Sequence, residues 1–399
     1  MKIIITGAGG NIGRALVPYL REKGHELLLV GRDAAKLQQL FPGDACCNYH
    51  DLQHIGSDYH SCVHLAVMNN DQHGSLADFR SANLTGLQHI FNDAKRAGVG
   101  HFINLTSFHA AHGNQQDPYA VSKREADQWL FEQQDMRISS LCLPAVNSQD
   151  AGGNLAKVNK LPAILRKIAL VVLGAAKPLV DRDLVVAAIA GLVEKNEAVS
   201  ISLANPVDRN IVYWTFKKIV DWGFALAVLL VTWWLMLILF IAVKLGSPGP
   251  GIFAQERVGR HGKSFICYKY RTMRTGTKQA GTHELSADAI TGIGAFLRKT
   301  KLDELPQVIN ILRGEISLVG PRPCLPVQSE LIKERKERGV LNILPGITGW
   351  AQINDIDMSD PVRLARADAD YMARRSIPFD LSIILKTFTG SGQGDRTAR

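Results

Sequence analysis

The 399-residue sequence lacks the cysteine patterns that bind metals or build disulfide frameworks. Its six cysteines form no CxxC pair and no Cys/His set with metal-ligand spacing, so we expect reduced core thiols in a cytosolic setting. A signal peptide is also not expected, because the apolar run at residues 3–5 stops at a glycine-rich turn. We find no internal repeat and no nucleic-acid-binding motif, and we therefore expect no nucleic-acid partner.

Acidic residues are scarce in one segment of the chain. Residues 244–301 contain eleven Lys or Arg residues, and their only acidic residues are Glu256, Glu284 and Asp288. This segment carries most of the net charge of +9. Such a concentration of positive charge indicates a surface that faces phosphates or anionic lipid headgroups.

One long segment lacks charge altogether. Residues 222–243 are 22 uncharged and mostly bulky apolar residues, and Asp221 immediately precedes them. That length is enough to enter or cross a bilayer. A buried core helix is the alternative, although core helices usually keep a polar stripe. We therefore predict a membrane-associated hydrophobic helix within residues 209–245.

The rest of the chain lies on either side of this helix. Residues 1–208 alternate amphipathic stretches with short β-branched runs, which predicts a Rossmann-type doubly wound parallel sheet covered by helices. The β-branched runs are residues 2–6, 26–30, 62–66 and 102–105. Residues 246–390 are rich in Gly, Pro and basic residues and predict a small, mainly helical domain. We expect residues 391–399 to form a frayed tail.

A glycine-rich turn follows the first predicted strand. Gly7, Gly10 and Gly13 have the spacing GxxGxxG and open a helix that should end near Gly24. Their missing side chains allow backbone N–H groups to approach a pyrophosphate closely. After the second strand, Arg32 stands where an acidic residue normally holds the ribose 2′-hydroxyl, which favours NADP(H). A solvated strand-end residue is the alternative for Arg32.

A tyrosine and a lysine further along the chain have the spacing of a catalytic pair. Tyr119 and Lys123 would share one face of a helix, because they are four residues apart. A free tyrosine has a pKa near ~10, and a lysine ammonium together with a cofactor's positive charge would lower it. Ser107, after the strand at 102–105, is placed to hydrogen-bond a substrate oxygen.

Together these residues resemble the extended short-chain dehydrogenase/reductase family, particularly its nucleotide-sugar epimerases, dehydratases and ketoreductases. The resemblance covers most of residues 1–205 and implies hydride transfer at a sugar hydroxyl or ketone, with NAD possible in place of NADP. It also implies cofactor contacts or positioning roles for further residues. These are Asn11 and Ile12 in the glycine turn, Asp51 and Leu52 at the adenine position, Ala66 after the fourth strand, and Asn83 on a following helix.

An acidic pair, Asp303 and Glu304, stands among cations in the C-terminal part. Pro306 suits the first turn of a helix that Gly314 would cap, so the pair would lie at the positive end of that helix. Such a setting keeps a carboxylate ionised and stabilises an arriving phosphate. A plain acidic helix start balanced by surface lysines is the alternative. The nearby cations are Arg298, Lys299 and Lys301.

Several motifs surround this pair in a fixed order. They are GSPGP at 246–250, QERVG at 255–259, YKYRTM at 268–273, VGPRP at 319–323 and PGITGWAQ at 345–352. With the acidic pair they resemble the bacterial sugar transferases, the monotopic phosphoglycosyl transferases, over about residues 214–390. The resemblance implies transfer of a sugar phosphate from a UDP-sugar to a polyprenyl phosphate such as undecaprenyl phosphate. This reaction would initiate the assembly of an O-antigen, capsule, exopolysaccharide or glycoprotein glycan.

The same resemblance implies roles for individual residues. Asp303 would attack the β-phosphorus of the UDP-sugar, expel UMP and hold the sugar phosphate until the polyprenyl phosphate attacks it. Mg²⁺ near Asp303 and Glu304 would neutralise the pyrophosphate. Candidates for phosphate contacts are Lys269, Arg271, Arg298 and Arg322.

The predicted membrane helix lacks the Ser-Pro pair that this family usually carries midway. Trp233 and Trp234 stand there, after Thr232. A proline would break the helix, so that it enters and leaves by one face of the membrane. The basic residues on both flanks still favour re-entry from the cytoplasmic face of a bacterial inner membrane. They are Lys217 and Lys218 before the helix and Lys244, Arg257 and Arg260 after it.

Three overall functions remain open from the sequence. In the first, the front domain modifies a UDP-sugar and the back domain loads it onto lipid. In the second, the transferase is fused to a front domain that only senses a nucleotide-sugar or NADP. In the third, the chain is a membrane-anchored reductase whose C-terminal part is a scaffold. A homodimer is possible in each case.

Overall fold

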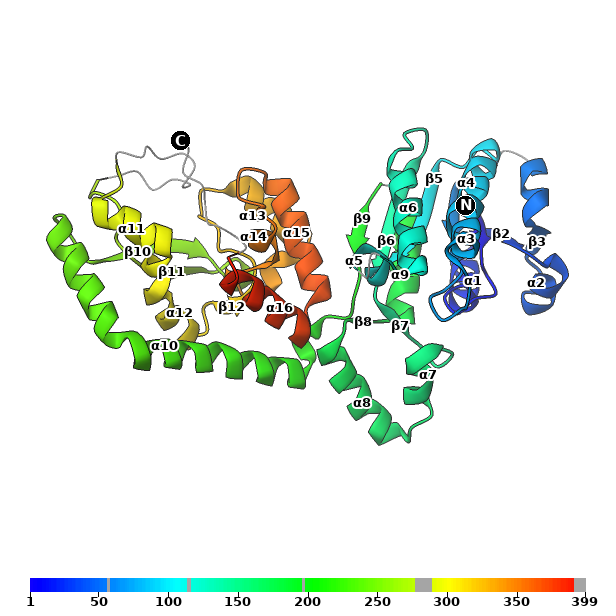
Figure 1. Ribbon diagram of the computed structural model, residues 1–399. Helices are drawn as coiled ribbons and strands as arrows, with labels where there is room; N and C mark the ends of the chain where they lie inside the picture. Colours follow the sequence, from blue (N-terminus) through cyan, green and yellow to red (C-terminus); the bar gives the residue numbers. More distant parts are fainter. Residues whose placement is uncertain (56–57, 113–115, 196–197, 277–288, 391–399) are drawn as a thin grey trace. The chain divides into compact units, whose positions relative to one another are not determined.

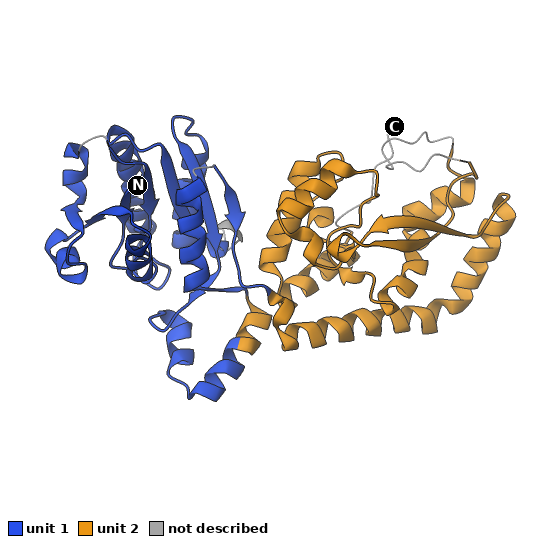
Figure 2. Cartoon of the chain, turned by 180° about the vertical axis from the view of Figure 1, so that it is seen from behind, with its two compact units in different colours: residues 1–170, 178–206 blue, residues 171–177, 207–399 orange. Residues whose placement is uncertain are grey.

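The computed structural model describes residues 1–55, 58–112, 116–195, 198–276 and 289–390. The tail predicted at 391–399 lies outside these residues. The chain divides into two compact units (Figure 2). The first unit comprises residues 1–170 and 178–206, and the second comprises residues 171–177 and 207–399.

The first unit is built on a seven-stranded parallel sheet with the strand order β3-β2-β1-β4-β5-β6-β9. The strands are β1 (Lys2–Thr6), β2 (Glu26–Gly31), β3 (Ala45–Asn48), β4 (Ser61–His64), β5 (His101–Ser107), β6 (Arg137–Leu143) and β9 (Ser200–Ser202). The predicted doubly wound sheet is thereby confirmed. The order reverses between β1 and β4, and this switch point is where such sheets bind ligands.

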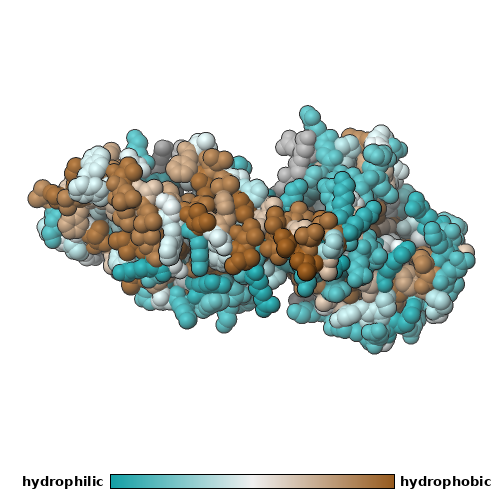
Figure 3. Space-filling model, turned by 90° about the horizontal axis from the view of Figure 1, so that it is seen from below, coloured by the Kyte–Doolittle hydropathy of each residue, from teal (hydrophilic) through white to brown (hydrophobic). Residues whose placement is uncertain are grey.

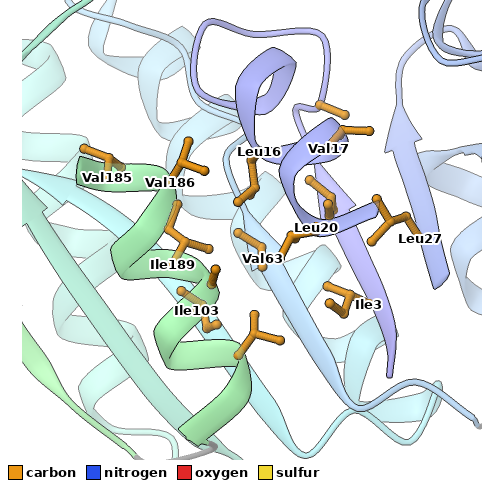
Figure 4. Close-up of a cluster of buried hydrophobic side chains, with 14 of the residues drawn as sticks. Ile3, Leu16, Val17, Leu20, Leu27, Val63, Ile103, Val185, Val186 and Ile189 are labelled. Atoms are coloured by element: carbon orange, nitrogen blue, oxygen red, sulfur yellow. The ribbon is translucent and has the colours of Figure 1, made fainter. Parts of the chain in front are cut away.

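Helices cover both faces of this sheet because its strands are apolar on both sides. Ile3 and Ile5 point to one face and Ile4 to the other, and each face has its own buried cluster. Figure 4 shows the first cluster, in which α1 (Gly13–Glu22) and α9 (Arg182–Lys195) pack on the strands. The other helices of this unit are α2 (Ala34–Leu40), α3 (Leu76–Arg80), α4 (Gly86–Arg96), α5 (Phe108–His112), α6 (Pro118–Phe131) and α7 (Gly153–Asn159). Helix α8 (Ala163–Ala176) is divided between the two units after Leu170.

Short elements complete this part of the chain. They are the 3₁₀ helix η1 (Tyr49–His54), the π-helical turn η2 (Ser81–Thr85), the parallel pair β7 (Ala145–Asn147) and β8 (Leu179–Asp181), and the 3₁₀ helix η3 (Val207–Arg209), which begins the second unit.

The second unit is mainly helical, as predicted (Figure 1). Its strands form two small pairs: β10 (Ile252–Val258) with β11 (Ser264–Tyr270), and β12 (Ser317–Val319) with β13 (Gly346–Thr348). Its helices are α10 (Ile211–Gly246), α11 (Gly292–Thr300), α12 (Val308–Leu312), α13 (Ser329–Glu337), α14 (Trp350–Ile353), α15 (Pro361–Arg374) and α16 (Ile377–Phe388). Its 3₁₀ helices are η4 (Arg260–Gly262), η7 (Leu302–Gln307) and η8 (Val340–Asn342).

Helix α10 is the predicted membrane helix. By length and composition it is able to cross a membrane, and only 11% of its most apolar stretch is buried. Such exposure does not fit the alternative of a buried core helix. Figure 3 shows hydrophobic residues gathered over this helix. The most exposed among them are Ile211, Ile219, Leu230, Val231, Trp233 and Leu245.

Helix α10 bends although it contains no proline (Figures 1 and 2). The Thr232 hydroxyl donates to the Val228 carbonyl at 2.6 Å. The Tyr270 hydroxyl, from β11, donates to the Met236 carbonyl at 2.7 Å. Both bonds occupy helix carbonyls and so compete with the helical hydrogen-bond ladder, which is a known cause of bending.

A buried polar network fixes the start of α10 to the rest of its unit. The Lys217 ammonium lies 3.0 Å from both the Asp380 carboxylate and the Val319 carbonyl oxygen. The hydroxyls of Tyr213 and Tyr371 also donate to Asp380, at 2.8 and 2.9 Å. Lys217 is only 7% exposed. Lys217 is therefore an internal ion-pair partner and not the solvated basic flank that the sequence predicted.

Candidate active sites

The acidic pair lies in a tight turn between two helices. Helix α11 ends at Thr300, Lys301 adopts a left-handed conformation with φ 58°, and η7 then carries Asp303 and Glu304. The predicted helix start at Pro306 was wrong, because Pro306 is inside this 3₁₀ turn and α12 begins at Val308. The tighter winding of a 3₁₀ turn sets the direction of both carboxylates.

Cations from two other elements converge on Glu304. Lys269 of β11 places its ammonium 2.6 Å from a Glu304 carboxylate oxygen, and Arg322 places a guanidinium nitrogen 3.5 Å from the same oxygen. Arg322 follows β12, in the loop that begins at Gly320. A side chain at Gly320 would collide with the backbone of the loop 344–346, which explains why glycine stands there. Close backbone packing thus brings Arg322 to the acidic pair.

The two carboxyl groups differ strongly in acidity. Burial, followed by the charge of Glu304, raises the pKa of Asp303 to about 6, although the surrounding cations oppose this. Burial alone would also raise the pKa of Glu304, but Lys269 and Arg322 outweigh it and lower that pKa to about 2. Glu304 is therefore a fixed anion that holds the cations, whereas Asp303 titrates near neutrality. Divergent pKa values in one site are typical of groups with different chemical tasks.

The remaining phosphate-contact candidates have different positions. Arg298 of α11 donates from its Nε to the Thr272 hydroxyl at 3.0 Å, and its charge acts on Asp303. Arg271 is buried and donates to the carbonyls of Ser247 and Pro248, at 2.6 and 2.9 Å. The structure thus assembles Lys269, Arg298 and Arg322 around the acidic pair. Arg271 instead fixes the end of α10 and the turn after it.

Magnesium fits this site only with few protein ligands. Mg²⁺ in phosphate-transfer sites is usually held by one or two carboxylates and takes its other ligands from substrate phosphates and water. The described residues contain no group of three or more His, Cys, Asp or Glu side chains that could hold a metal ion. Asp303 and Glu304 match that sparse donor set.

The glycine turn of the first unit lies at the switch point between β1 and β4. Gly7 has φ +71°, and a side chain there would place its Cβ 2.7 Å from the Ala66 backbone nitrogen. A side chain at Gly13 would collide with the backbone of Ala8. The turn is therefore pressed against the end of β4 and the start of α1, as a cradle for a dinucleotide requires.

The other predicted cofactor residues surround this turn. Arg32 is exposed directly after β2, and Asp51 accepts a hydrogen bond from the Asn48 backbone at 3.3 Å. Leu52 is buried in the core, 1% exposed. Asn11 accepts hydrogen bonds from the Ser148 hydroxyl and the Arg182 guanidinium, at 2.9 and 3.2 Å. Ile12 precedes α1 and packs against the core.

The predicted catalytic side chains come together at the end of β5. The Tyr119 hydroxyl lies 3.2 Å from the Ser107 hydroxyl oxygen. The Lys123 ammonium donates to the Leu105 carbonyl at 2.8 Å, and Lys123 is 3% exposed. Burial raises the pKa of Tyr119 and lowers that of Lys123. The sequence predicted a lowered pKa for Tyr119, and for the chain alone this prediction is wrong, because burial outweighs the hydrogen bond with Ser107.

Sequence reasoning missed two charged residues near these groups. Asp127 accepts hydrogen bonds from Thr106 and Asn104, and its charge acts on Lys123. Its position one helical turn after Lys123 was a usable signal. Arg182 reaches the glycine turn from α9, 171 residues away from Asn11. No local pattern marks so distant a contact.

Two family models match the chain, one for each part. The bacterial sugar transferase family matches residues 212–393, and the NAD dependent epimerase/dehydratase family matches residues 3–187.

Three curated relatives resemble the C-terminal part. A UDP-glucose:undecaprenyl-phosphate glucose-1-phosphate transferase of Xanthomonas campestris pv. campestris is 37% identical over 45% of this chain and 40% of the relative. An Escherichia coli (strain K12) protein of the same name is 39% identical over 37% of this chain and 34% of the relative. The uncharacterized sugar transferase EpsL of Bacillus subtilis (strain 168) is 37% identical over 43% of this chain and 84% of the relative.

The chain thus spans well under half the length of the first two relatives, but most of the third. The chain therefore belongs to the bacterial sugar transferase family, and its residues 3–187 match the NAD dependent epimerase/dehydratase family.

Proposed function

We propose that this chain transfers a sugar 1-phosphate from a UDP-sugar to undecaprenyl phosphate at the cytoplasmic face of a bacterial inner membrane. The observation that carries the proposal is the Asp303 carboxyl group, held among three cations in a unit that exposes a long apolar helix. Relatives named as undecaprenyl-phosphate glucose-1-phosphate transferases support the same chemistry. We further propose that α10 enters and leaves the membrane by one face, because its bend allows a return.

The proposed reaction has two displacements at phosphorus. In the first, an Asp303 carboxylate oxygen bonds to the β-phosphorus of the UDP-sugar while the bond to UMP breaks. In the second, an oxygen of undecaprenyl phosphate bonds to that phosphorus and releases the Asp303 carboxylate. Lys269, Arg298 and Arg322 would bind phosphate oxygens and stabilise the charge that develops on them. Mg²⁺ bound at Asp303 and Glu304 would neutralise part of the negative charge of the pyrophosphate.

The front domain would act on the nucleotide-sugar itself, as an NADP-dependent ketoreductase or epimerase. Tyr119 would exchange a proton with a sugar oxygen that Ser107 orients. Lys123 would bind the ribose of the cofactor. The glycine turn supports a dinucleotide, because Gly7, Gly10 and Gly13 have no side chains and so leave backbone N–H groups accessible to a pyrophosphate. A bound nicotinamide's positive charge would lower the tyrosine pKa that burial raises.

Product analysis tests the overall proposal. Purified chain in nanodiscs would be given a panel of UDP-sugars with undecaprenyl phosphate, with and without NADPH, and the products would be identified by mass spectrometry. A lipid diphosphate-sugar and UMP are expected. A sugar changed by two mass units only with NADPH would identify a ketoreductase, and a sugar of unchanged mass but altered configuration by NMR would identify an epimerase. Sugars unchanged in both mass and configuration would favour the sensing alternative for the front domain.

The transfer rate should have an acid limb near pH 6. The pKa of Asp303 is raised to about 6, so the nucleophile is protonated below that pH and the rate should fall about tenfold per unit. Glu304→Gln removes a charge that raises this pKa, so the limb should move to lower pH in that variant. Rate measurements from pH 5 to 8 check both expectations. A limb that stays in place in Glu304→Gln would contradict the assignment to Asp303.

Tyr119→Phe should stop redox or epimerase activity and leave transfer from a ready-made UDP-sugar unchanged. Loss of a proton-transfer group typically lowers a rate by roughly 10²–10⁴-fold. NADPH consumption, epimerised UDP-sugar and lipid-linked product would be measured on the same samples. Tyr19→Phe, a half-buried tyrosine of α1, is the matched control and should keep both activities. An equal fall in transfer would mean that the two chemistries are not independent.

Arg32→Asp should weaken binding of NADP(H) relative to NAD(H). A guanidinium holds a 2′-phosphate by parallel charge-assisted hydrogen bonds of roughly 1.5–3 kcal/mol each, so about tenfold or more in relative affinity is expected to be lost. Calorimetric titration of both cofactors measures the ratio. Lys195→Asp, with the same charge change at an exposed site on α9, should preserve it. Equal wild-type affinities would show that Arg32 does not select the cofactor.

A further inference from the structure

Helix α8 exposes an unusual amount of hydrophobic surface for a helix in water. Among its 14 residues only Ala175 is buried. Ile164, Leu165 and Ile168 are 75%, 52% and 56% exposed. Ile168 is four residues from Ile164 and three from Leu165, so these three side chains lie on one side of the helix. A contiguous exposed apolar face of this kind marks a surface that another phase or molecule covers.

The chain around α8 is basic and contains no acid. Residues 151–180 include five Lys or Arg residues and neither Asp nor Glu. An apolar helix face whose charged residues within the same segment are all cations is the pattern of helices that lie in an anionic bilayer interface. Protein interfaces, in contrast, are depleted in lysine. The basic residues are Lys157, Lys160, Arg166, Lys167 and Lys177.

The end of α8 is attached to the start of the predicted membrane helix. The Asn210 side-chain amide, which caps α10, donates to the Val171 carbonyl at 2.7 Å, and Ala175 packs with Tyr213. Ile211, the first residue of α10, is 71% exposed. The last residues of α8, from Val171 on, therefore lie in the second unit together with the start of α10, whereas Ile164, Leu165 and Ile168 belong to the first unit. Figure 3 shows hydrophobic residues over both helices.

We propose that α8 is a second membrane contact, lying flat in the interface of an anionic bilayer. Ile164, Leu165 and Ile168 would enter the acyl-chain boundary, and Arg166 and Lys167 would meet phosphate headgroups. This contact lies in the segment that precedes the transferase match at residue 212. It would give the first unit, to which Ile164, Leu165 and Ile168 belong, a membrane contact in addition to that of α10.

Photo-crosslinking to lipid tests this contact in the full-length protein. Ile168→photoleucine, which carries a diazirine, would be made in the whole chain and reconstituted in nanodiscs of phosphatidylcholine and phosphatidylglycerol. Irradiation should yield a phospholipid adduct, identified by mass spectrometry, at a level comparable to that of Leu230→photoleucine on α10. Phe131→photoleucine, at a 70% exposed apolar position of α6, is the matched control and should yield none.

The outcomes separate a membrane from a second copy of the chain. A lipid adduct at position 168 supports the proposal. A protein–protein adduct there, or no adduct while position 230 labels, overturns it, because the face would then be a dimer interface or free in water. Both results are independent of transferase activity, so failure of the proposed function would not affect them.

Charge substitution tests the lipid specificity. Each cation near an anionic membrane surface raises the partition coefficient of the protein segment by roughly fivefold. Arg166→Gln with Lys167→Gln should therefore lower the adduct yield at position 168 by about fivefold or more in phosphatidylglycerol nanodiscs. In nanodiscs of phosphatidylcholine alone the same variant should match the unsubstituted chain. An unchanged yield in the anionic nanodiscs would overturn the role of these cations.

Discussion

Replacing Asp303 with asparagine is expected to reduce sugar-phosphate transfer to background. An amide oxygen cannot displace UMP to form the acyl-phosphate, and loss of a covalent nucleophile costs on the order of 10⁴-fold or more in kcat. The amide has almost the same shape as the carboxyl, so the turn η7 should remain intact. Transfer would be measured as lipid-linked sugar formed from a radiolabelled UDP-sugar.

A single-turnover experiment separates this loss from a loss of binding. Without lipid acceptor, the wild-type chain should release UMP and retain an equal amount of labelled sugar phosphate, whereas Asp303→Asn should retain none. Glu330→Gln removes one carboxylate from an exposed position on α13 of the same unit and should behave as wild type. Stoichiometric label on the asparagine variant would assign the nucleophile to another residue.

Replacing Lys217 with methionine is expected to destabilise the second unit by about 3–5 kcal/mol. The substitution leaves the Asp380 carboxylate buried without its cation, and an uncompensated buried charge costs this much. For a unit of this size, the melting temperature should fall by roughly 6–20 °C. Thermal unfolding in nanodiscs, followed separately for the two units, measures the change.

Two further variants make this test specific. Lys218→Met removes the same charge from the neighbouring exposed residue and should change stability by less than about 0.5 kcal/mol. Lys217→Met combined with Asp380→Asn should be more stable than Lys217→Met alone, because the unpaired charge is gone. A similar fall for both lysines would show that the network does not anchor α10.

Local features of the sequence were enough to predict the class of each part. The β-branched runs and the GxxGxxG spacing predicted the parallel sheet and its glycine turn, because both depend on short-range periodicity and on the missing side chains of three glycines. The uncharged stretch at 222–243 predicted the membrane-associated helix for a similar reason, because a run of apolar residues is more stable in a bilayer than in water. Asp303 and Glu304 stood out because charges of both signs crowd into a few residues.

Contacts between distant segments decided what the individual charges do. Lys269 is 35 residues from Glu304 in the chain and forms the shortest ion pair of that glutamate. Arg271, two positions after Lys269, instead points toward the end of α10. Lys217 resembled a solvated flank but is paired with Asp380, 163 residues away. The pKa of Asp303 likewise depends on burial and on cations that the fold brings from β11 and the loop after β12. The sequence by itself determined which elements form, whereas only the tertiary structure decided which charges meet, because electrostatic interactions depend on distance in space and on exclusion of water.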